Sequence, residues 1–261
     1  MTPLLEIEGL NISIPVAQGT LKAVRNVSFT VSRGETLGVV GESGCGKSLT
    51  ALAIMGLLPR HAKATSRRFF FEGEDLSKAS EAQRATLRGD QMAMIFQEPM
   101  TALNPTLTIG LQLTEVMRRH RSVSWNEARE RAVELLARVG VSEPRARLDQ
   151  YPHALSGGLR QRVMIAMALM CGPKLIVADE PTTALDVTIQ AQILNLLSEL
   201  KAERDMSMVF ISHDLGVVSR IADRIIVMYA GEIVEAGSRA NVLGNPRHPY
   251  TRALLDCLPV P

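Results

Sequence analysis

The 261-residue chain is poor in residues that would assign it to several specialised classes of protein. Aromatic side chains make up only 4% of it, so Leu, Val, Ile, Ala and Met must fill the core. Its three cysteines, Cys45, Cys171 and Cys257, have neither metal-ligand spacing nor the pattern of a disulfide framework. The composition excludes a disulfide-based scaffold and is that of an ordinary globular chain, 46% hydrophobic.

An excess of one charge and a long apolar run are also missing. Lys and Arg number 29 against 27 Asp and Glu, which gives a net charge of +2. The basic clusters Arg67–Arg68 and Arg118–Arg121 have no interleaved aromatic residues, so we expect solvated surfaces and no nucleic-acid partner. The longest apolar run, Val163–Cys171, is far too short to span a bilayer, and Met1–Glu8 lack the features of a signal peptide. Any membrane function must therefore come through partner subunits.

A complete phosphate-binding loop is the most informative feature that is present. The pattern G-x-x-x-x-G-K-[ST] is met by Gly41, Glu42, Ser43, Gly44, Cys45, Gly46, Lys47 and Ser48. It lies between a predicted buried strand, Thr36–Val40, and a predicted helix start, Leu49–Met55. Glycines let backbone N–H groups wrap around phosphate oxygens, Lys47 can reach the β- and γ-phosphates, and the Ser48 hydroxyl can ligate Mg²⁺. The loop therefore predicts nucleotide binding.

Two carboxylates follow a second apolar segment, Leu175–Ala178. A continuous run of this kind predicts a strand buried on both faces, as in parallel sheets. Asp179 and Glu180 stand at its C-terminal end, where open α/β sheets place their ligands. A lone pair of this type is often an acidic turn after a core strand. Beside a phosphate loop, we interpret Asp179 as a group for the Mg²⁺ shell and Glu180 as a base for an attacking water.

A second anion-binding feature lies far from the first in sequence. Ser156 is a good helix N-cap, and Gly157 and Gly158 leave backbone N–H groups open to an anion at the start of the following helix. One nucleotide needs only one such cradle. The economical interpretation is that these three residues serve a nucleotide held by another subunit.

These motifs, in this order, resemble the nucleotide-binding subunits of ABC transporters, and the resemblance covers essentially the whole chain. It implies ATP and Mg²⁺ as cofactors and ATP hydrolysis as the activity. It also implies roles for a glutamine that links Mg²⁺ and water to a helical subdomain, for a loop that touches the opposite subunit, and for a histidine that senses the γ-phosphate. These are Gln97, Asp186 in Ala184–Asp186, and His213. The implied catalytic residues are Glu180, His213 and Gln97, and the implied Mg²⁺ ligands are Ser48, Gln97 and Asp179.

The predicted fold is α/β: a P-loop NTPase core of ABC ATPase type with an antiparallel β subdomain and an inserted helical subdomain. Leu4–Ile14 and Val24–Val31 alternate apolar and polar residues as half-buried antiparallel strands do. In Trp125–Arg138 the apolar residues fall on one face, which predicts a helix. We assign residues 1–104 and 160–261 to the core, and about 105–159 to the helical subdomain, which contains the signature motif Ser156, Gly157 and Gly158.

The C-terminal segment Asn245–Leu255 narrows the resemblance to importers for dipeptides, oligopeptides and nickel. Many members carry a cysteine-rich extension with an iron–sulfur cluster. We expect no cluster here, because the sequence stops at Pro261, shortly after Cys257. The position where the family usually has an aromatic residue that stacks on adenine corresponds to Ile14. A nearby or partner residue would then have to substitute for it.

The predicted protein is the ATP-hydrolysing subunit of a membrane importer, with peptides as first substrate and nickel or a metal chelate as the alternative. Its expected partners are a second, related ATPase subunit in a heterodimer, two membrane-spanning permease subunits and an extracytoplasmic binding protein. The expected location is the cytoplasmic face of the membrane, since oxidation of Cys45 would block the loop outside a reducing cytosol. A soluble ABC-type ATPase of DNA repair would need a long coiled coil between the phosphate loop and Leu155, and the sequence there is too short and irregular for one. An ABC-type translation factor would need two cassettes in one chain, and only one is present in this sequence. Glu180 and His213 disfavour a regulator that binds nucleotide without hydrolysis.

Overall fold

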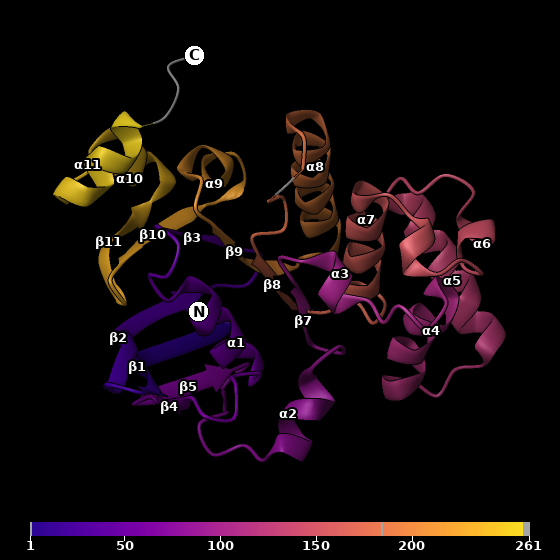
Figure 1. Cartoon of the computed structure of the whole chain (residues 1–261), viewed down its shortest axis with the longest axis horizontal. Coiled ribbons are helices and arrows are strands. Elements are labelled where there is room, and N and C mark those ends of the chain that lie inside the picture. The colour runs from indigo at the N-terminus through magenta and orange to yellow at the C-terminus, as the bar shows by residue number, and fades with distance from the viewer. Residues whose placement is uncertain (1, 184, 258–261) are drawn as a thin grey trace. The chain divides into compact units, whose positions relative to one another are not determined.

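A computed structural model of the chain describes residues 2–183 and 185–257, with helices and strands labelled in Figure 1. By its internal contacts the chain divides into two compact units. Unit 1 comprises residues 1–84 and 205–261, and unit 2 comprises residues 85–204. No helix in the described ranges is long and apolar enough to cross a membrane.

Unit 1 contains an antiparallel sheet in the order β2-β1-β5-β6, with β4 paired to β1. Its strands are β1 (Leu5–Val16), β2 (Gly19–Val31), β4 (Lys63–Thr65), β5 (Arg68–Phe71) and β6 (Glu74–Asp75). Along β1, buried Leu5, Ile7 and Leu10 alternate with more exposed residues, as a sheet with one covered face requires. The predicted pair of half-buried antiparallel strands is confirmed.

Unit 1 also contains the strands around the phosphate loop, in the order β11-β10-β3-β9. They are β3 (Thr36–Val40), β9 (Ser207–Ser212), β10 (Arg224–Tyr229) and β11 (Glu232–Ser238). β3 runs parallel to both of its neighbours, and β11 is antiparallel to β10. All five residues of β3 are buried, because a central parallel strand is covered on both faces.

The helices of unit 1 are short. They are α1 (Lys47–Met55), α9 (Leu215–Ile221), α10 (Arg239–Gly244) and α11 (Pro249–Asp256), while α2 (Glu81–Leu87) spans the boundary at residue 84. The sequence analysis predicts the start of α1 but assigns no helix to α2, α10 or α11. Figure 1 places α10 and α11 together beside β11.

Unit 2 consists of two parallel strands and a group of helices. The strands are β7 (Met92–Ile95) and β8 (Leu175–Asp179). The helices are α3 (Pro99–Ala102), α4 (Ile109–His120), α5 (Trp125–Arg138), α6 (Pro144–Arg147), η1 (Pro152–Ala154), α7 (Gly157–Ala168) and α8 (Val187–Arg204). Helix α7 packs against α3, α4, α5 and β7, so it is central to this unit.

Helix α5 shows how local sequence sets these elements. The Ser124 hydroxyl accepts a hydrogen bond from the Glu127 N–H, the N-terminal pattern in which Ser is followed three residues later by Glu. The residues predicted to share its apolar face are all buried: Ala128, Ala132, Leu135 and Leu136. The predicted bounds, Trp125–Arg138, are those of the helix. The predicted limits of the larger subdomain, about residues 105–159, stay a prediction.

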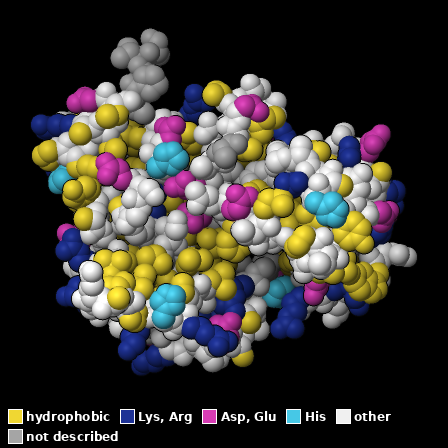
Figure 2. All heavy atoms as spheres, in the orientation of Figure 1, with side chains coloured by type: hydrophobic (Ala, Val, Ile, Leu, Met, Phe, Trp, Pro, Cys, Tyr) yellow, Lys and Arg dark blue, Asp and Glu magenta, His cyan; other side chains and the backbone are white. Residues whose placement is uncertain are grey.

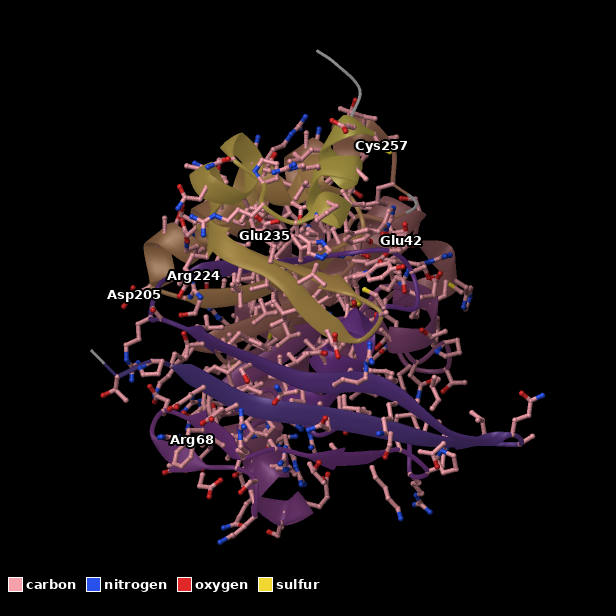
Figure 3. All side chains as sticks on the ribbon, turned by 90° about the vertical axis from the view of Figure 1, so that its left-hand side faces the viewer. Glu42, Arg68, Asp205, Arg224, Glu235 and Cys257 are labelled. Carbon is pink, nitrogen blue, oxygen red and sulfur yellow. The ribbon has the colours of Figure 1, made fainter. Side chains whose placement is uncertain are left out.

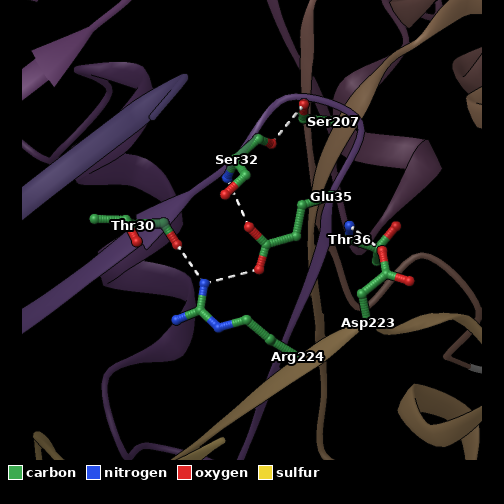
Figure 4. A network of polar contacts seen from close by, with 7 residues as sticks. All are labelled: Thr30, Ser32, Glu35, Thr36, Ser207, Asp223 and Arg224. Carbon is green, nitrogen blue, oxygen red and sulfur yellow. Dashed lines mark hydrogen bonds and ion pairs between the residues drawn. The ribbon is translucent and has the colours of Figure 1, made fainter. Parts of the chain in front are cut away.

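A polar network joins the strands of unit 1 below the start of β3 (Figure 4). The Glu35 carboxylate is almost fully buried and accepts hydrogen bonds from the Ser32 N–H at 2.6 Å and from the Arg224 guanidinium at 2.8 Å. Arg224 also donates to the Thr30 carbonyl at 3.3 Å. The network therefore ties β10 to the end of β2, across the turn that leads into β3.

The same turn is fixed on its other side by β9 and by the loop before β10. The Ser207 hydroxyl accepts from the Gly34 N–H and donates to the Ser32 carbonyl. The Asp223 carboxylate accepts from the Thr36 N–H at 2.8 Å. Because β3 leads directly into the phosphate loop, these contacts set where that loop begins.

We expect Arg224→Ala to lower the free energy of unfolding by about 2 kcal/mol, because it leaves the buried Glu35 carboxylate without its cationic partner. Arg67→Ala is the control, since it removes an ion pair to Glu8 in which both side chains are exposed, and exposed pairs contribute about 0–1 kcal/mol. Urea unfolding monitored by circular dichroism measures both variants. Equal losses of stability in the two variants would contradict a structural role for the ion pair between Arg224 and the buried Glu35.

Candidate nucleotide site

The phosphate loop follows β3 and leads into α1, all within unit 1. Glu42, Ser43 and Gly44 are exposed at its tip, while Cys45, Gly46 and Lys47 are buried. Ser48 lies in the first turn of α1. The N-terminus of a helix presents unpaired N–H groups and partial positive charge, so the exposed tip is suited to a phosphate group.

Two glycines of the loop are required by their surroundings. Gly41 has a φ of 154°, and a Cβ there would overlap the Met228 carbonyl and lie 2.8 Å from the Cys45 sulfur. Gly46 has a φ of 103°, and a Cβ there would lie 2.8 Å from the Ala23 carbonyl. L-residues rarely adopt such φ values. The loop therefore follows a path on which backbone atoms of β2 and β10 leave no room for side chains.

Lys47 folds back over the loop that contains it. Its Nζ donates to the Gly41 carbonyl at 2.7 Å and to the Glu42 carbonyl at 2.9 Å, and only 4% of the residue is exposed. The ammonium group is thus held at the mouth of the loop by two neutral acceptors. A phosphate oxygen binds an ammonium group more strongly than a neutral carbonyl does, so a nucleotide can compete for it.

The Cys45 thiol fills the space beneath Gly41, with 5% of the residue exposed. Its sulfur lies 3.9 Å from Lys47 Nζ. Burial raises the pKa of the Cys45 thiol above its usual value, and the nearby Lys47 only partly offsets this. Sequence reasoning placed a thiol in the loop, but only the structure shows that the thiol is shielded there.

His213 directly follows β9 and is exposed. β9 is the parallel neighbour of β3, with Val40 opposite Ser212, so His213 and Gly41 leave adjacent strands at the same edge of the sheet. The next residue, Asp214, caps α9 by accepting from the Gly216 and Val217 N–H groups. His213 is thereby placed at the C-terminal end of a parallel strand.

Ile14 lies on β1 opposite Leu21 of β2, toward the end of their hairpin. Leu21 is 52% exposed, and Val16 at the tip is 47% exposed. Phe29 is the only aromatic residue between positions 5 and 31, and it is buried. The described hairpin therefore offers aliphatic contacts to a flat ring. That a nearby or partner residue substitutes for the aromatic one stays a prediction.

In unit 2, Asp179 is the last residue of β8 and Glu180 directly follows it, as predicted. Both are buried: Asp179 is 6% exposed and Glu180 is 9% exposed. Glu180 Oε2 accepts hydrogen bonds from Gln97 Nε2 at 3.2 Å and from the Thr183 hydroxyl at 2.9 Å. Gln97 follows β7, the parallel neighbour of β8. Two residues 83 positions apart, which the sequence linked only through a family resemblance, are thus in direct contact.

The backbone of Glu180 has a φ of +46°, in the left-handed region that non-glycine residues seldom adopt. The turn after it is tied to the signature helix, because Gln161 of α7 donates to the Pro181 carbonyl. Backbone strain of this kind persists only where surrounding contacts hold it, and it is common at functional sites. The sequence analysis assigned no role to Thr183 or Gln161.

The signature residues begin helix α7. The Ser156 hydroxyl caps it by accepting from the Leu159 N–H at 3.4 Å, as its sequence position predicts. Ser156 and Gly157 are exposed, and a Cβ on Gly157 would meet nothing within 4 Å. This surface is therefore open to a ligand, and Gly158 is partly exposed beside it.

A cavity of about 410 Å³ lies between the signature helix and the segment after Gln97. It is lined by Gln97, Glu98, Pro99, Met100, Gly157, Arg160, Gln161, Thr183 and Leu185. Asp186 follows on the exposed side and accepts from the Ile189 N–H at 2.8 Å, which caps the start of α8. Asp186 therefore has a local structural role besides the one that the resemblance implies. Ala184 lies outside the described residues.

On the face that Figure 2 shows, Lys and Arg side chains lie among acidic, hydrophobic and other residues. Two members of the Arg118–Arg121 cluster have local partners. Arg118 lies 4.0 Å above the ring of Trp125, and Arg121 pairs with Asp90. These contacts agree with the prediction of a solvated helix face.

Comparison with known proteins identifies the family. Residues 24–183 match the model described as ABC transporter. The chain belongs to the ABC transporter family. Residues 234–261 match a second model, described as the oligopeptide/dipeptide transporter C-terminal region. The predicted membership of the dipeptide and oligopeptide group is therefore confirmed.

Three relatives illustrate the similarity of this ABC protein to that group. It is 52% identical to the dipeptide transport ATP-binding protein DppD of Bacillus subtilis, with 99% of this chain and 78% of that protein covered. It is 53% identical to the oligopeptide transport ATP-binding protein OppD of the same organism, with 99% and 73% covered. It is also 53% identical to the glutathione import ATP-binding protein GsiA of Escherichia coli, with 98% of this chain but 42% of that protein covered.

Solved ABC cassettes have the same fold. The structure described as a dimeric post-hydrolysis state of the ATP-binding cassette MJ0796, bound to ADP and Pi, has a TM-score of 0.82 and 28% sequence identity. The match covers 90% of this chain and 98% of that one. CbiO1 from Clostridium perfringens matches with a TM-score of 0.77 and 26% identity. The predicted ABC ATPase fold with an antiparallel β subdomain is confirmed.

We expect iodoacetamide to alkylate Cys45 more slowly than the exposed Cys257 at pH 8, because burial shields the thiol and its raised pKa leaves less thiolate. The Cys45 rate should still increase at pH values where the rate of an unperturbed thiol has levelled off, because a raised pKa moves the formation of thiolate to higher pH. Mass spectrometry of the alkylated peptides over pH 7–10 measures both rates. Equal rates at pH 8 would contradict the buried position.

Proposed function

We propose that the chain is the ATP-hydrolysing subunit of an importer for dipeptides or oligopeptides, acting through membrane-spanning partner subunits. The observation that carries the proposal is the Glu180 carboxylate, which Gln97 and Thr183 hold at the end of β8 in a chain with a complete phosphate loop. The names of DppD and OppD support the substrate class, and so does the match of the C-terminal region. Peptide import is therefore preferred to nickel or metal-chelate import.

In this proposal the phosphates of ATP are bound by the loop from Gly41 to Ser48. The N–H groups at the start of α1 face the β-phosphate, and Lys47 exchanges its two carbonyl acceptors for β- and γ-phosphate oxygens. Ser48, Gln97 and Asp179 would hold Mg²⁺, and each supplies an oxygen donor that suits this hard cation. Within the described residues no group of three His, Cys, Asp or Glu side chains could hold a metal ion. Phosphate oxygens would then complete the shell.

Hydrolysis in this proposal is the transfer of the γ-phosphoryl group to water. Glu180 takes the proton of the attacking water, and its hydrogen bonds from Gln97 and Thr183 fix the direction of the carboxylate. His213 contacts the γ-phosphate from the end of β9. Bound Mg²⁺ would neutralise charge on the phosphate oxygens. The protein's contribution is therefore position and charge, which is the usual division in phosphoryl transfer.

We further propose that two ATPase subunits pair so that Ser156, Gly157 and Gly158 bind the γ-phosphate of ATP held by the partner. Their exposure supports this, because groups that bind a partner's nucleotide must be accessible in the single chain. The solved MJ0796 cassette is described as a dimer, which supports pairing as such. The partner is proposed to be a related second ATPase, with Asp186 in the loop between them.

Contact with the membrane-spanning permeases is proposed at a groove in unit 2. Its volume is about 440 Å³, and Ala102, Asn104, Glu115 and Arg119 contribute to its lining. Ala102 ends helix α3, which begins two residues after Gln97. A partner seated in the groove would thus be connected to the glutamine that contacts Glu180. The assembly would place this chain at the cytoplasmic face of the membrane and receive substrate from an extracytoplasmic binding protein.

We expect Glu180→Gln to bind ATP normally and to lose turnover by at least about a hundredfold, because an amide cannot accept the proton of the attacking water.

We expect Lys47→Ala to lose binding and turnover together, because the ammonium group contacts phosphate before and during the reaction. ATP titration and phosphate release by the complete transporter complex measure the two effects.

Lys63→Ala, an exposed lysine on β4, is the matched control and should change neither quantity. Near-normal hydrolysis in Glu180→Gln would contradict the assignment of the base. An unchanged dissociation constant with normal turnover in Lys47→Ala would contradict nucleotide binding at the loop.

We expect Ser156→Ala in the complete complex to reduce turnover at the partner's phosphate loop by about a hundredfold, the typical cost of one transition-state donor. ATP should stay bound at Lys47 of the same chain. Ser124→Ala is the control, because Ser124 caps α5 in the same way and is assigned no nucleotide. Equal effects in both would indicate lost helix capping only. A complex with two copies of this chain and no second ATPase would reject the heterodimer.

A further inference from the structure

A C-terminal helix contacts the phosphate loop through one hydroxyl group. The Tyr250 hydroxyl of α11 accepts a hydrogen bond from the backbone N–H of Glu42 at 3.0 Å. Glu42 is the second residue of the loop and lies 208 positions away in the sequence. It directly follows Gly41, whose carbonyl accepts from Lys47. The contact therefore acts at the point where the chain leaves β3 and begins to curve around the phosphate position.

The Tyr250 ring is held in place by a second tyrosine. Tyr229, the last residue of β10, has its ring centroid 4.6 Å from that of Tyr250, with the planes tilted by 47°. Partial burial raises the pKa of the Tyr250 hydroxyl, so the group stays neutral over the physiological range. β10 also supplies the Met228 carbonyl that excludes a side chain at Gly41.

Helix α11 is itself anchored to β11 by the Glu235 carboxylate. This group accepts hydrogen bonds from the Arg247 N–H at 2.8 Å and from the His248 N–H at 3.0 Å. Burial alone would raise the pKa of Glu235, but these bonds and the nearby Thr251 side chain lower it. In Figure 3, Glu235 is labelled on β11 below the C-terminal helices, and Glu42 is labelled to its right.

The first turn of α11 is capped so that Tyr250 has a fixed direction. His248 Nδ1 accepts from the Tyr250 N–H at 3.2 Å, and Pro249 occupies the first helical position. Thr251 is fully buried beside them. An unbroken series of contacts therefore runs from Glu235 through the start of α11 to the hydroxyl that meets the loop.

We propose that Tyr250 is a positioning residue for the phosphate loop, and that the docked state of helix α11 thereby sets the affinity of this chain for nucleotide. The inference rests on the proposed binding of ATP at the loop. The Glu42 N–H is turned toward Tyr250 and is fixed before ATP arrives, which reduces the ordering that ATP binding requires. Undocking of α11 from β11 would release the start of the loop and weaken the binding of any nucleoside triphosphate.

The test is Tyr250→Phe, which keeps the ring and removes only the acceptor. We expect the dissociation constant of ATP to rise about three- to tenfold, the range that one neutral hydrogen bond supports. The constant for GTP should rise by the same factor, because the effect acts on phosphate and not on the base. Turnover by the complete transporter complex at saturating ATP should stay within about twofold. Tyr229→Phe is the matched control and should change neither nucleotide's affinity.

A second variant tests the contact between Glu235 and the start of α11, at the far end of the series from Tyr250. Glu235→Ala removes the anchor of α11 without touching Tyr250 or Glu42, and it should weaken ATP and GTP binding by a similar factor. Asp256→Ala, an exposed carboxylate at the end of the same helix, is its control. Hydrogen exchange of the peptide that contains Glu42 should become faster in Tyr250→Phe and Glu235→Ala and stay unchanged in both controls.

Unchanged ATP affinity in Tyr250→Phe, with binding lost in Lys47→Ala, would overturn this inference and leave the proposed function intact. A change in the ratio of ATP to GTP affinity would also overturn it, because it would indicate contact with the base. ATP binding that persists in Lys47→Ala would instead reject the proposed site itself.

Discussion

The close approach of two backbone carbonyls to the phosphate loop is the constraint on which the conformation of that loop depends. The Met228 carbonyl of β10 excludes a side chain at Gly41, and the Ala23 carbonyl of β2 excludes one at Gly46. The loop is thus held between two strands, and its N–H groups are directed by its surroundings as well as by its own sequence. The ion pair between the buried Glu35 and the partly exposed Arg224 keeps β2, β3 and β10 together at the other end of β3. The same strands therefore determine both where the loop begins and how it curves.

A different kind of constraint orders the residues of unit 2 that are proposed to act in hydrolysis. Glu180 has a left-handed backbone conformation and a carboxylate that Gln97 and Thr183 hold, while Gln161 of the signature helix bonds to the next residue. The turn after β8 is therefore connected to the segment after β7 and to helix α7. In a chain proposed to respond to its partner subunits, such connections are what allow a shift of the signature helix or of Gln97 to change the direction of the Glu180 carboxylate.

The C-terminal region has a similar place in unit 1. Its match to the oligopeptide/dipeptide transporter model begins within β11, close to Glu235, and includes the start of α11. This region thus contains both the anchor of the helix and the hydroxyl that meets Glu42. The region that matches the oligopeptide/dipeptide transporter model is therefore in contact with the phosphate loop, which lies within the segment that matches the ABC transporter model. This gives the region a physical connection to nucleotide binding.

The sequence by itself determined the phosphate loop, the buried strands β3 and β8, helix α5 with its apolar face, and the family. These features are set by short-range patterns: glycine spacing, continuous apolar runs and helix caps. The family resemblance, and not the spacing, supplied Gln97, Asp186 and His213. Only the tertiary structure decided that Gln97 contacts Glu180, that the Cys45 thiol is buried, and that Tyr250 meets Glu42. Each of these depends on side chains brought together from distant positions, because strand pairing and helix docking set such distances and no local pattern encodes them.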